Sequence, residues 1–574
     1  MYHPNALFRN SNRQAHPARA SFLVGVICLI FSTATRAALP PPAPDGGYPS
    51  FNTAEGDNAL FSLTIGNSNT AAGYAALFAI TSGSNNTAVG ASALTSLSTG
   101  VSNTALGDHA LSTNSTGGFN TAAGTSALMS LTIGSANTAV GDHALYSTTS
   151  ANNNTATGVS ALYSNTTGGP NTADGDHALY TNTTGAQNTA VGSQALFLNS
   201  TGNYNTAVGT QALYTNSTGS YNTAAGVSAL AANTTGIANA ALGQGALTSN
   251  TTGKYNTASG CNALTTNIAG MENTSSGYDA LYANTSGSNN TASGYEALLS
   301  NTTASNNTAE GSQALRGNTT GNYNTASGVG ALTKNTTGIS NTAGGAQALS
   351  SNTAGNYNTA EGDHALSHAT GSNNIGLGHL AGYLLTTGGN NIDLGHQGLA
   401  AESGTIRIGT KGTQTATYIA GISGATVAGG VSVIVDGNGH LGTVVSSRRF
   451  KQDIQDMDKS SESILSLRPV SFQYKQELDP EGISQYGLVA EEVEKVNPDL
   501  VARDAEGKVF TVRDEAVNAM LLNEFLKAHK KLGLQEATIG EQQKEIAALQ
   551  AGLQEIREQL RSAKPAPQAP VSNP

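Results

Sequence analysis

The sequence predicts a mainly β protein: a β-solenoid or β-roll-like repeat shaft, then a small α+β domain and a C-terminal coiled-coil helix. Asparagine recurs every 17 residues from Asn52 to Asn358 without a slip, which makes nineteen units in phase. The chain holds 68 glycines and no tryptophan, and only 11% of its residues are charged, so its composition is that of a repeat protein. Ordinary helix and strand patterns follow residue 445, and a seven-residue apolar period comes after them.

One unit, NTAVGTQALYTNSTGSY from Asn205 to Tyr221, is typical of the array. A fixed period of this length indicates a solenoid, in which each unit is one turn and buries its inner face only against neighbouring turns. Asn-Thr-Ala-x-Gly suits a strand and a corner because Gly209 is free to take a positive φ. Ala212 and Leu213 are the inward-pointing apolar residues, and Asn-x-Thr-Gly is turn chemistry. The pattern leaves open whether Gly-x-x-Ala-Leu is a second strand or one helical turn.

Changes in composition divide the chain into seven predicted segments. They are a signal peptide (1–37), a Pro/Gly linker (38–51), the β-solenoid array (52–400), a β-rich neck (401–445), a small domain of ordinary composition (446–533), a coiled coil (534–562) and a disordered tail (563–574).

The N-terminal 37 residues have the features of an export signal. Arg9, Arg13 and Arg19 precede a short apolar run, FLVGVICLIF, and an imperfect small-residue cleavage site ends at Ala37. An uncleaved anchor is the alternative, although this run is too short for a comfortable membrane span. We therefore expect a protein that is secreted or held at the cell surface.

The array offers little apolar area in a single chain, which favours assembly. Ordering the residues of one unit costs roughly 25 kcal/mol, and offsetting that by burial alone takes on the order of 1,000 Å² of apolar area. One leucine and a few alanines fall well short, so hydrogen bonds between coils and burial between chains have to contribute. The C-terminal helix supplies a seam for a coiled coil, which in this context we expect to be trimeric. The residues seven places apart in that seam are Phe525, Leu532, Ile539, Ile546, Leu553 and Leu560.

A junction at residues 446–451, SSRRFK, separates the array from the charge-rich C-terminal part. A serine and a lysine at this spacing carry little information alone, but LRPVSFQYK follows at residues 467–475 and GLVAEEVEKVNPDLV at residues 487–501. As a set, these motifs resemble the C-terminal intramolecular chaperone of endosialidase-type phage tail spikes and its bacterial relatives, the self-cleaving Ser-Lys peptidase family. Separately, the Asn/Ala/Gly rhythm of residues 52–400 resembles the head repeats of trimeric autotransporter adhesins.

The chaperone resemblance implies a role for each end of the junction. That family opens with Ser-Asp-x-Arg-x-Lys, which places the nucleophile on Ser446, the general base on Lys451 and the scissile bond between Val445 and Ser446. Ser447 stands where the family has Asp or Asn, and it is a second candidate nucleophile. A serine hydroxyl needs a neighbouring base, and lysine acts as a base only when desolvation keeps it neutral. The resemblance further implies a pocket completed between subunits, so that cleavage follows trimer folding.

Other chemistries find little support in the sequence. A net charge of −11 gives no electrostatic reason to expect nucleic acid as a partner. Cys28 and Cys261 make no disulfide framework or zinc spacing, and we expect no cofactor and no metal. Four Gly-Asp-His-Ala-Leu units place a carboxylate beside an imidazole. Metal binding is conceivable where three chains bring histidines together, although a polar surface is the simpler interpretation.

These observations predict an exported homotrimeric fibre, like an adhesin or a tail fibre. Its C-terminal chaperone would template trimerisation and then release itself as a single-turnover serine endopeptidase, with no other catalytic activity expected. Its partners would be two further copies of the chain and a surface glycan or another ligand on a host or cell surface. The alternative is a soluble solenoid that binds ice or polysaccharide and keeps a non-cleaving chaperone domain. Regular threonine ranks on one flat face would favour ice binding.

Overall fold

The computed structural model describes residues 47–422, 425–436, 438–504 and 506–563. The predicted export signal lies outside the described residues, as do residues 38–46 of the predicted linker and 564–574 of the predicted tail. Within the described ranges, no helix combines the length and the apolar character that crossing a membrane requires. The chain divides into two compact units between Gly409 and Thr410.

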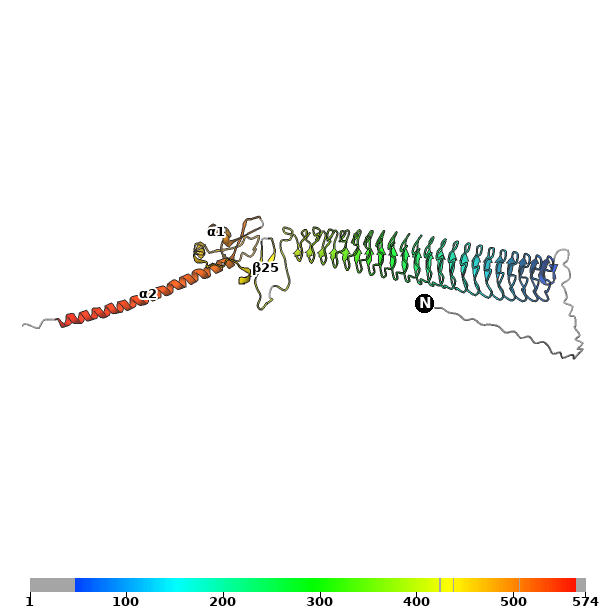
Figure 1. The fold of residues 1–574 in the computed structure, drawn as a ribbon, viewed down its shortest axis with the longest axis horizontal. Helices are drawn as coiled ribbons and strands as arrows, with labels where there is room; N and C mark the ends of the chain where they lie inside the picture. Colours follow the sequence, from blue (N-terminus) through cyan, green and yellow to red (C-terminus); the bar gives the residue numbers. More distant parts are fainter. Residues whose placement is uncertain (1–46, 423–424, 437, 505, 564–574) are drawn as a thin grey trace, which may run out of the picture. The chain divides into compact units, whose positions relative to one another are not determined.

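The first unit is the β-solenoid that the repeat predicts (Figure 1). Each coil contributes one short strand, and strands of consecutive coils pair in parallel and in register. Thr189 lies beside Thr206, and Thr206 lies beside Thr223. The result is one 23-stranded sheet in the described chain. Its last strand, β23, pairs with β22, so the sheet continues past residue 400 into the segment assigned to the neck.

At the N-terminal end, β1 pairs antiparallel with β2 and Tyr48 packs on the core, so the first coil is covered. A one-turn 3-10 helix, η1 (Pro49–Phe51), joins the two strands. The strands of this sheet are β1 (Gly47–Tyr48), β2 (Asn52–Glu55), β3 (Thr70–Ala72), β4 (Thr87–Val89), β5 (Thr104–Leu106), β6 (Thr121–Ala123), β7 (Thr138–Val140), β8 (Thr155–Thr157), β9 (Thr172–Asp174), β10 (Thr189–Val191), β11 (Thr206–Val208), β12 (Thr223–Ala225), β13 (Ala240–Leu242), β14 (Thr257–Ser259), β15 (Thr274–Ser276), β16 (Thr291–Ser293), β17 (Thr308–Glu310), β18 (Thr325–Ser327), β19 (Thr342–Gly344), β20 (Thr359–Glu361), β21 (Ile375–Leu377), β22 (Ile392–Leu394) and β23 (Ile406–Ile408).

Within a coil, two tight turns follow the strand. Ala212 N–H donates to the carbonyl of Gly209, and Asn216 N–H donates to the carbonyl of Leu213, each at 3.2 Å. Leu213 has a φ of 53°, so Gly-x-x-Ala-Leu is neither a strand nor a helical turn. Ala212 and Leu213 are fully buried, which confirms the predicted inward residues. Gly209 has a φ of 129°, and a Cβ there would lie 2.7 Å from the carbonyl oxygen of Gly226, so only glycine fits.

Buried asparagines join the coils along the solenoid. The side-chain amide of Asn69 donates to the carbonyl of Gly83 in the same coil at 2.9 Å. Its Oδ1 accepts from both the backbone N–H and the side-chain amide of Asn86, each at 3.1 Å. The backbone bond to the preceding asparagine recurs coil after coil as far as Asn391. Every buried amide in this ladder therefore has partners, which removes the cost of taking a polar group out of water.

From Asn165 to Asn352, each coil buries a second asparagine, and its side chain bonds across the predicted Asn-x-Thr-Gly turn. The side-chain amide of Asn182 donates to Oδ1 of Asn165 at 2.8 Å and to the carbonyl of Gly185 at 3.0 Å. This ladder continues to Asn352. Several earlier coils hold apolar side chains at the same place, namely Leu63, Ile80, Leu97 and Leu131. The core therefore changes from apolar packing to hydrogen bonding along the array.

The second unit is a small assembly of hairpins, short helices and one long helix, as the fold class predicts. Its elements are β24 (Val433–Val435), β25 (Leu441–Thr443), η2 (Arg448–Phe450), η3 (Asp458–Ser466), β26 (Val470–Phe472), β27 (Gln485–Gly487), α1 (Ala490–Val496), η4 (Pro498–Leu500), β28 (Val501–Arg503), β29 (Val509–Val512) and α2 (Asp514–Ser562). Strand pairs β24–β25, β26–β27 and β28–β29 are antiparallel. In the described part of this unit, the buried apolar core consists of Val493, Leu500, Val501 and Met520.

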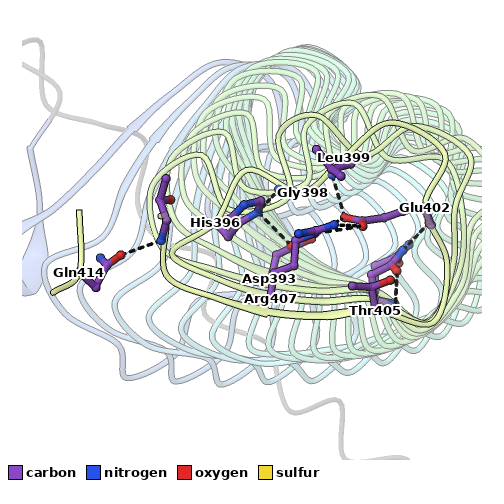
Figure 2. Close-up of polar contacts among 11 residues, drawn as sticks. Asp393, His396, Gly398, Leu399, Glu402, Thr405, Arg407 and Gln414 are labelled. Atoms are coloured by element: carbon purple, nitrogen blue, oxygen red, sulfur yellow. Dashed lines mark hydrogen bonds and ion pairs between the residues drawn. The ribbon is translucent and has the colours of Figure 1, made fainter. Parts of the chain in front are cut away.

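Near its C-terminal end, the solenoid places a carboxylate where most coils place an alanine. Asp393 lies at the centre of β22, and its side chain is 1% exposed. Within the described residues, its Oδ2 has no hydrogen-bond partner, while Oδ1 lies 3.7 Å from Nδ1 of His396 (Figure 2). Burial, helped by the charge of Glu402 and opposed by Arg407, raises the pKa of Asp393 to about 6. Arg407 and Glu402 form a two-pronged ion pair beside it.

A raised carboxyl pKa makes this end of the solenoid sensitive to pH. The folded state favours protonated Asp393, so its stability is highest below the ordinary pKa near 4 and falls as pH rises through 6. The full loss is about 3 kcal/mol, roughly half of it between pH 5 and 7.5. We expect Asp393→Asn, which stays neutral, to remove this decline in hydrogen-exchange protection factors of β22 and β23.

The wild-type chain is the control for that variant. Burial lowers the pKa of His396, so its contribution has the opposite sign, but it is present in both chains and largely cancels in their difference. A variant with the same pH profile as the wild type would show that Asp393 is not the group responsible.

Candidate functional site

The predicted cleavage site lies on an exposed turn of the second unit. Ser446 and Ser447 precede the one-turn helix η2, and Lys451 follows it. The turn is closed by hydrogen bonds from Phe450 N–H to the carbonyl of Ser447 (3.0 Å) and from Lys451 N–H to the carbonyl of Arg448 (3.1 Å). The serines and the lysine therefore belong to one short turn, and the side chains of all three are exposed.

A single chain does not assemble the proposed dyad. Among the residues that the structure describes, no hydrogen bond joins the side chains of Ser446 and Lys451. The scissile-bond residue Val445 is 55% exposed. A lysine accepts the serine proton only where desolvation favours its neutral form, so the chemistry requires something that covers the turn and desolvates Lys451.

The surroundings of the turn are apolar enough to be covered in this way. Val444, Val445, Phe450 and Ile454 are each more than half exposed. The guanidinium carbon of Arg449 lies 4.6 Å from the centre of the Phe450 ring, which holds a cation over that ring. Large apolar side chains gathered on one exposed segment indicate a surface that packs against another element.

The later sequence motifs meet in the fold. β26 belongs to the first motif, β27 ends at the start of the second, and they form one hairpin with Val470 beside Gly487. Arg468 donates two hydrogen bonds to the carboxylate of Glu492, at 3.1 and 2.6 Å. This pair lowers the pKa of Glu492 and raises that of Arg468. One hairpin and one bidentate ion pair therefore hold the two motifs together, although they are far apart in the chain.

An open apolar groove of about 640 Å³ runs beside this hairpin. It lies between η3, the β26–β27 hairpin and the first turns of α2, and Ser471 and Tyr486 contribute hydroxyl groups to its lining. Tyr486 and Leu521 on its rim are 86% and 56% exposed. The remaining lining residues are Ile464, Leu467, Pro469, Val470, Gly487, Leu488 and Val517. The second unit thus leaves apolar area uncovered around a core of very few residues.

A serine and a lysine do meet in this unit, at a place that the sequence analysis missed. Ser461 in η3 is fully buried, and Lys527 of α2 donates to its hydroxyl at 3.2 Å. The same lysine donates to the carboxylate of Glu524 at 2.6 Å, and Asn523 donates to Ser461 at 2.7 Å. Lys527 is held by the carboxylate of Glu524, and the fully buried Ser461 is out of reach of a substrate. The cluster therefore fastens η3 to α2, and its wide separation in sequence explains why no local pattern revealed it.

The Asp-His pairs of the array lie on the outside of the solenoid. Nδ1 of His109 lies 2.9 Å from Asp108, and His143 and Asp142 repeat that distance. Within the described residues of this single chain, no group of three or more His, Cys, Asp or Glu side chains is placed to hold a metal ion. In the single chain the pairs are polar surface features.

Comparison with known proteins identifies the C-terminal segment. Residues 446–502 match the peptidase family described as chaperone of endosialidase. The match begins at Ser446 and includes both later motifs, so the predicted resemblance of this segment is confirmed. No curated protein and no solved structure matches the chain. A segment that matches the chaperone-of-endosialidase family therefore follows a β-solenoid.

The polar cluster around Ser461 gives a test that separates structure from catalysis. Ser461→Ala removes a buried hydroxyl that bonds to Glu524, Asn523 and Lys527, so we expect a loss of about 1–3 kcal/mol in stability. Denaturant unfolding followed by the helical circular dichroism signal measures it.

Ser466→Ala is the matched control, because Ser466 is exposed at the end of the same helix. We expect it to change stability by less than about 0.5 kcal/mol. A Ser461→Ala chain of unchanged stability that no longer cleaves itself would instead make Ser461 a nucleophile.

Proposed function

We propose that this chain is an exported homotrimeric fibre, like an adhesin or a tail fibre, with a C-terminal intramolecular chaperone that templates trimerisation and then releases itself. The observation that carries the proposal is the junction between the shaft and the C-terminal segment. The segment that matches a family of self-cleaving chaperones begins at Ser446, after the solenoid and the β24–β25 hairpin. Cleavage there would leave the whole shaft on one product and the whole chaperone on the other.

The proposed reaction is a serine-mediated hydrolysis of the Val445–Ser446 peptide bond. Neutral Lys451 takes the proton of the Ser446 hydroxyl, whose oxygen attacks the carbonyl carbon of Val445. The carbon–nitrogen bond breaks, the proton passes to the departing amine, and Val445 is held as an ester on Ser446. Water then opens the ester, leaving a carboxylate on Val445 and a free amino group on Ser446. The net reaction consumes one water and needs no cofactor.

Trimerisation would supply what a single chain lacks at this site. Apolar residues at seven-residue spacing along α2 are more than half exposed, which is expected of a helix whose partners are other copies of itself. Packing of three copies would also cover the apolar side chains around the turn and desolvate Lys451. Lysine loses its proton more readily when desolvated, so cleavage would wait for assembly.

Export would bring the fibre to the outside of the cell. The basic and apolar pattern of residues 1–37 supports a signal peptide and a secreted or surface location. There the shaft would present its coils to a glycan or another ligand on a host or cell surface. The acidic balance of the chain supports partners other than nucleic acid.

A second candidate is a soluble ligand-binding solenoid that retains a non-cleaving chaperone, with ice or a polysaccharide as ligand. One observation favours it: threonines of successive strands form an in-register rank on the exposed face of the solenoid sheet. The dyad residues are also exposed in the single chain. The two candidates differ in whether Val445–Ser446 is cut.

The first prediction of the proposal concerns the mass of the product. We expect the full-length chain to split into a shaft ending at Val445 and a fragment of residues 446–574, seen by intact-mass spectrometry. Ser446→Ala and Lys451→Ala remove the nucleophile and the base, and each should leave the chain whole.

Ser447→Ala is the matched control, because it alters the neighbouring hydroxyl on the same turn. A Ser446→Ala chain that still splits at this bond would contradict the assignment. Splitting that is lost only in Ser447→Ala would move the nucleophile one residue along.

The second prediction links assembly to cleavage. Ile546→Asp with Leu553→Asp puts charge into the seam of α2, where burial without a partner costs several kcal/mol per site. We expect this chain to lose both trimer formation, measured by analytical ultracentrifugation, and cleavage, measured by mass. Its repeats should also become sensitive to protease.

Ala547→Asp with Gln554→Asp is the control, since these residues lie one place outside the seam on the same helix. We expect that control to trimerise and to split. A seam variant that forms trimers as well as the wild type would rule out the coiled coil as the template.

A further inference from the structure

The exposed face of the solenoid sheet is unusually regular. In each strand, the middle residue points inward and its two neighbours point outward: Ala207 is buried, whereas Thr206 and Val208 are exposed. Threonine holds the first of these outward places without interruption from Thr53 to Thr223, and again from Thr257 to Thr359. We call this column the threonine rank. Because consecutive strands pair in register, the threonines of neighbouring coils lie side by side, and only Ala240 interrupts the column between Thr53 and Thr359.

The hydroxyls of the threonine rank are unused by the fold. Between Thr53 and Thr359, none of them forms a hydrogen bond within the described chain. Threonines elsewhere in the coil behave differently: Thr234 donates its hydroxyl to the carbonyl of Thr251 at 3.0 Å, and Thr251 repeats the contact to Ile268 at 3.1 Å. Those hydroxyls join coil to coil. The hydroxyls of the rank face solvent, so they are available to an external ligand.

The second outward column adds methyl groups. From β3 to β13 it holds mainly aliphatic side chains, and the most exposed of them are Val89, Leu106, Val140, Val191, Val208 and Leu242. From β14 to β20 the same column holds serine, glutamate or glycine. Neither column contains an aromatic residue from β2 to β20, and acidic residues interrupt the second column only at Glu55, Asp174, Glu310 and Glu361. Aromatic rings are confined to other columns, where Tyr146 and Tyr163 stack with centroids 5.0 Å apart. The sheet face is therefore rich in hydroxyl and methyl groups, and short of the rings on which sugars stack.

The spacing of the rank restricts what it can bind. Adjacent strands of a sheet lie about 4.8 Å apart, so hydroxyls recur at that interval along the axis. A single hydroxyl or methyl contact with water is weak. Many such contacts add up only for a ligand that is held as one body and repeats at nearly the same interval, because each further contact then costs little entropy. Ordered water in an ice crystal has a repeat close to this interval, and liquid water does not.

We propose that the threonine rank and the aliphatic column beside it form an ice-binding face. The proposal rests on the ligand-binding function given above as the second candidate, and it selects ice over polysaccharide. Hydroxyls of the rank would take the places of lattice waters, and the methyl groups would sit in the hollows between them. An extended glycan is the weaker choice, since the face offers no aromatic ring and few charges to orient a sugar.

The test compares two double variants in the same two coils of the full chain. Thr206→Lys with Thr223→Lys places two bulky charges in the rank. Thr218→Lys with Thr235→Lys places the same changes on exposed turn threonines outside the sheet. Thermal hysteresis and inhibition of ice recrystallisation are measured on each. We expect activity in the wild type, loss of most of it in the rank variant, and full activity in the turn variant.

Three results would overturn the proposal: a wild-type chain without activity on ice, equal loss in both variants, or no loss in either. Pulldown on insoluble polysaccharides run beside these assays would place the ligand among glycans if only the rank variant lost binding there while ice activity was absent. The intact mass of the same wild-type sample tests the chaperone proposal separately, because it shows whether the chain is cleaved. An uncleaved chain that still inhibits ice growth would leave the ice-binding face standing.

Discussion

The structure depends on how closely one coil can lie against the next. At the corner of each coil, glycine meets glycine at a distance that leaves no room for a Cβ, as Gly209 does against Gly226. That approach brings the buried asparagines of successive coils within hydrogen-bond distance, so Asn69 and Asn86 can satisfy each other. A coil with one residue too many would separate both contacts. Regular spacing of the strands, and hence of everything on the surface, follows from this one constraint.

Hydrogen bonding of this kind explains how so thin a protein can have a core. Most coils bury a leucine and a few alanines, and the asparagine ladders join the coils through amide groups that bond to one another and to the backbone. The second ladder is not required throughout, since Leu63, Ile80, Leu97 and Leu131 fill the same place in earlier coils. The ends have no neighbouring coil, and they are treated differently: β1 covers one, and the Glu402–Arg407 ion pair lies beside buried Asp393 near the other. The outward residues are free to vary, which is why function resides on the faces.

The second unit follows a different principle. It has a small buried core, an open apolar groove and a long helix with an exposed apolar seam. A domain with so little covered area gains most of its stability from what packs against it. Its proposed catalytic residues also depend on packing. Ser446 and Lys451 lie on a solvent-exposed turn and need a covering surface to become reactive. Folding, assembly and chemistry would then occur in a set order.

Period and motif spacing were enough to determine the solenoid, the strand at Asn-Thr-Ala-x-Gly and the family of residues 446–502. These are local or repeating features, and a repeated unit reports its environment many times over. Tertiary structure alone decided the rest. Asn182 lies at the predicted turn, but its burial depends on the stacking of Asn165 upon it rather than on its neighbours in sequence. Leu213 at positive φ, the Ser461–Lys527 contact and the unpartnered carboxylate of Asp393 are likewise set by groups far away in the chain. Side-chain contacts of that kind leave no periodic trace, so only the folded molecule reveals them.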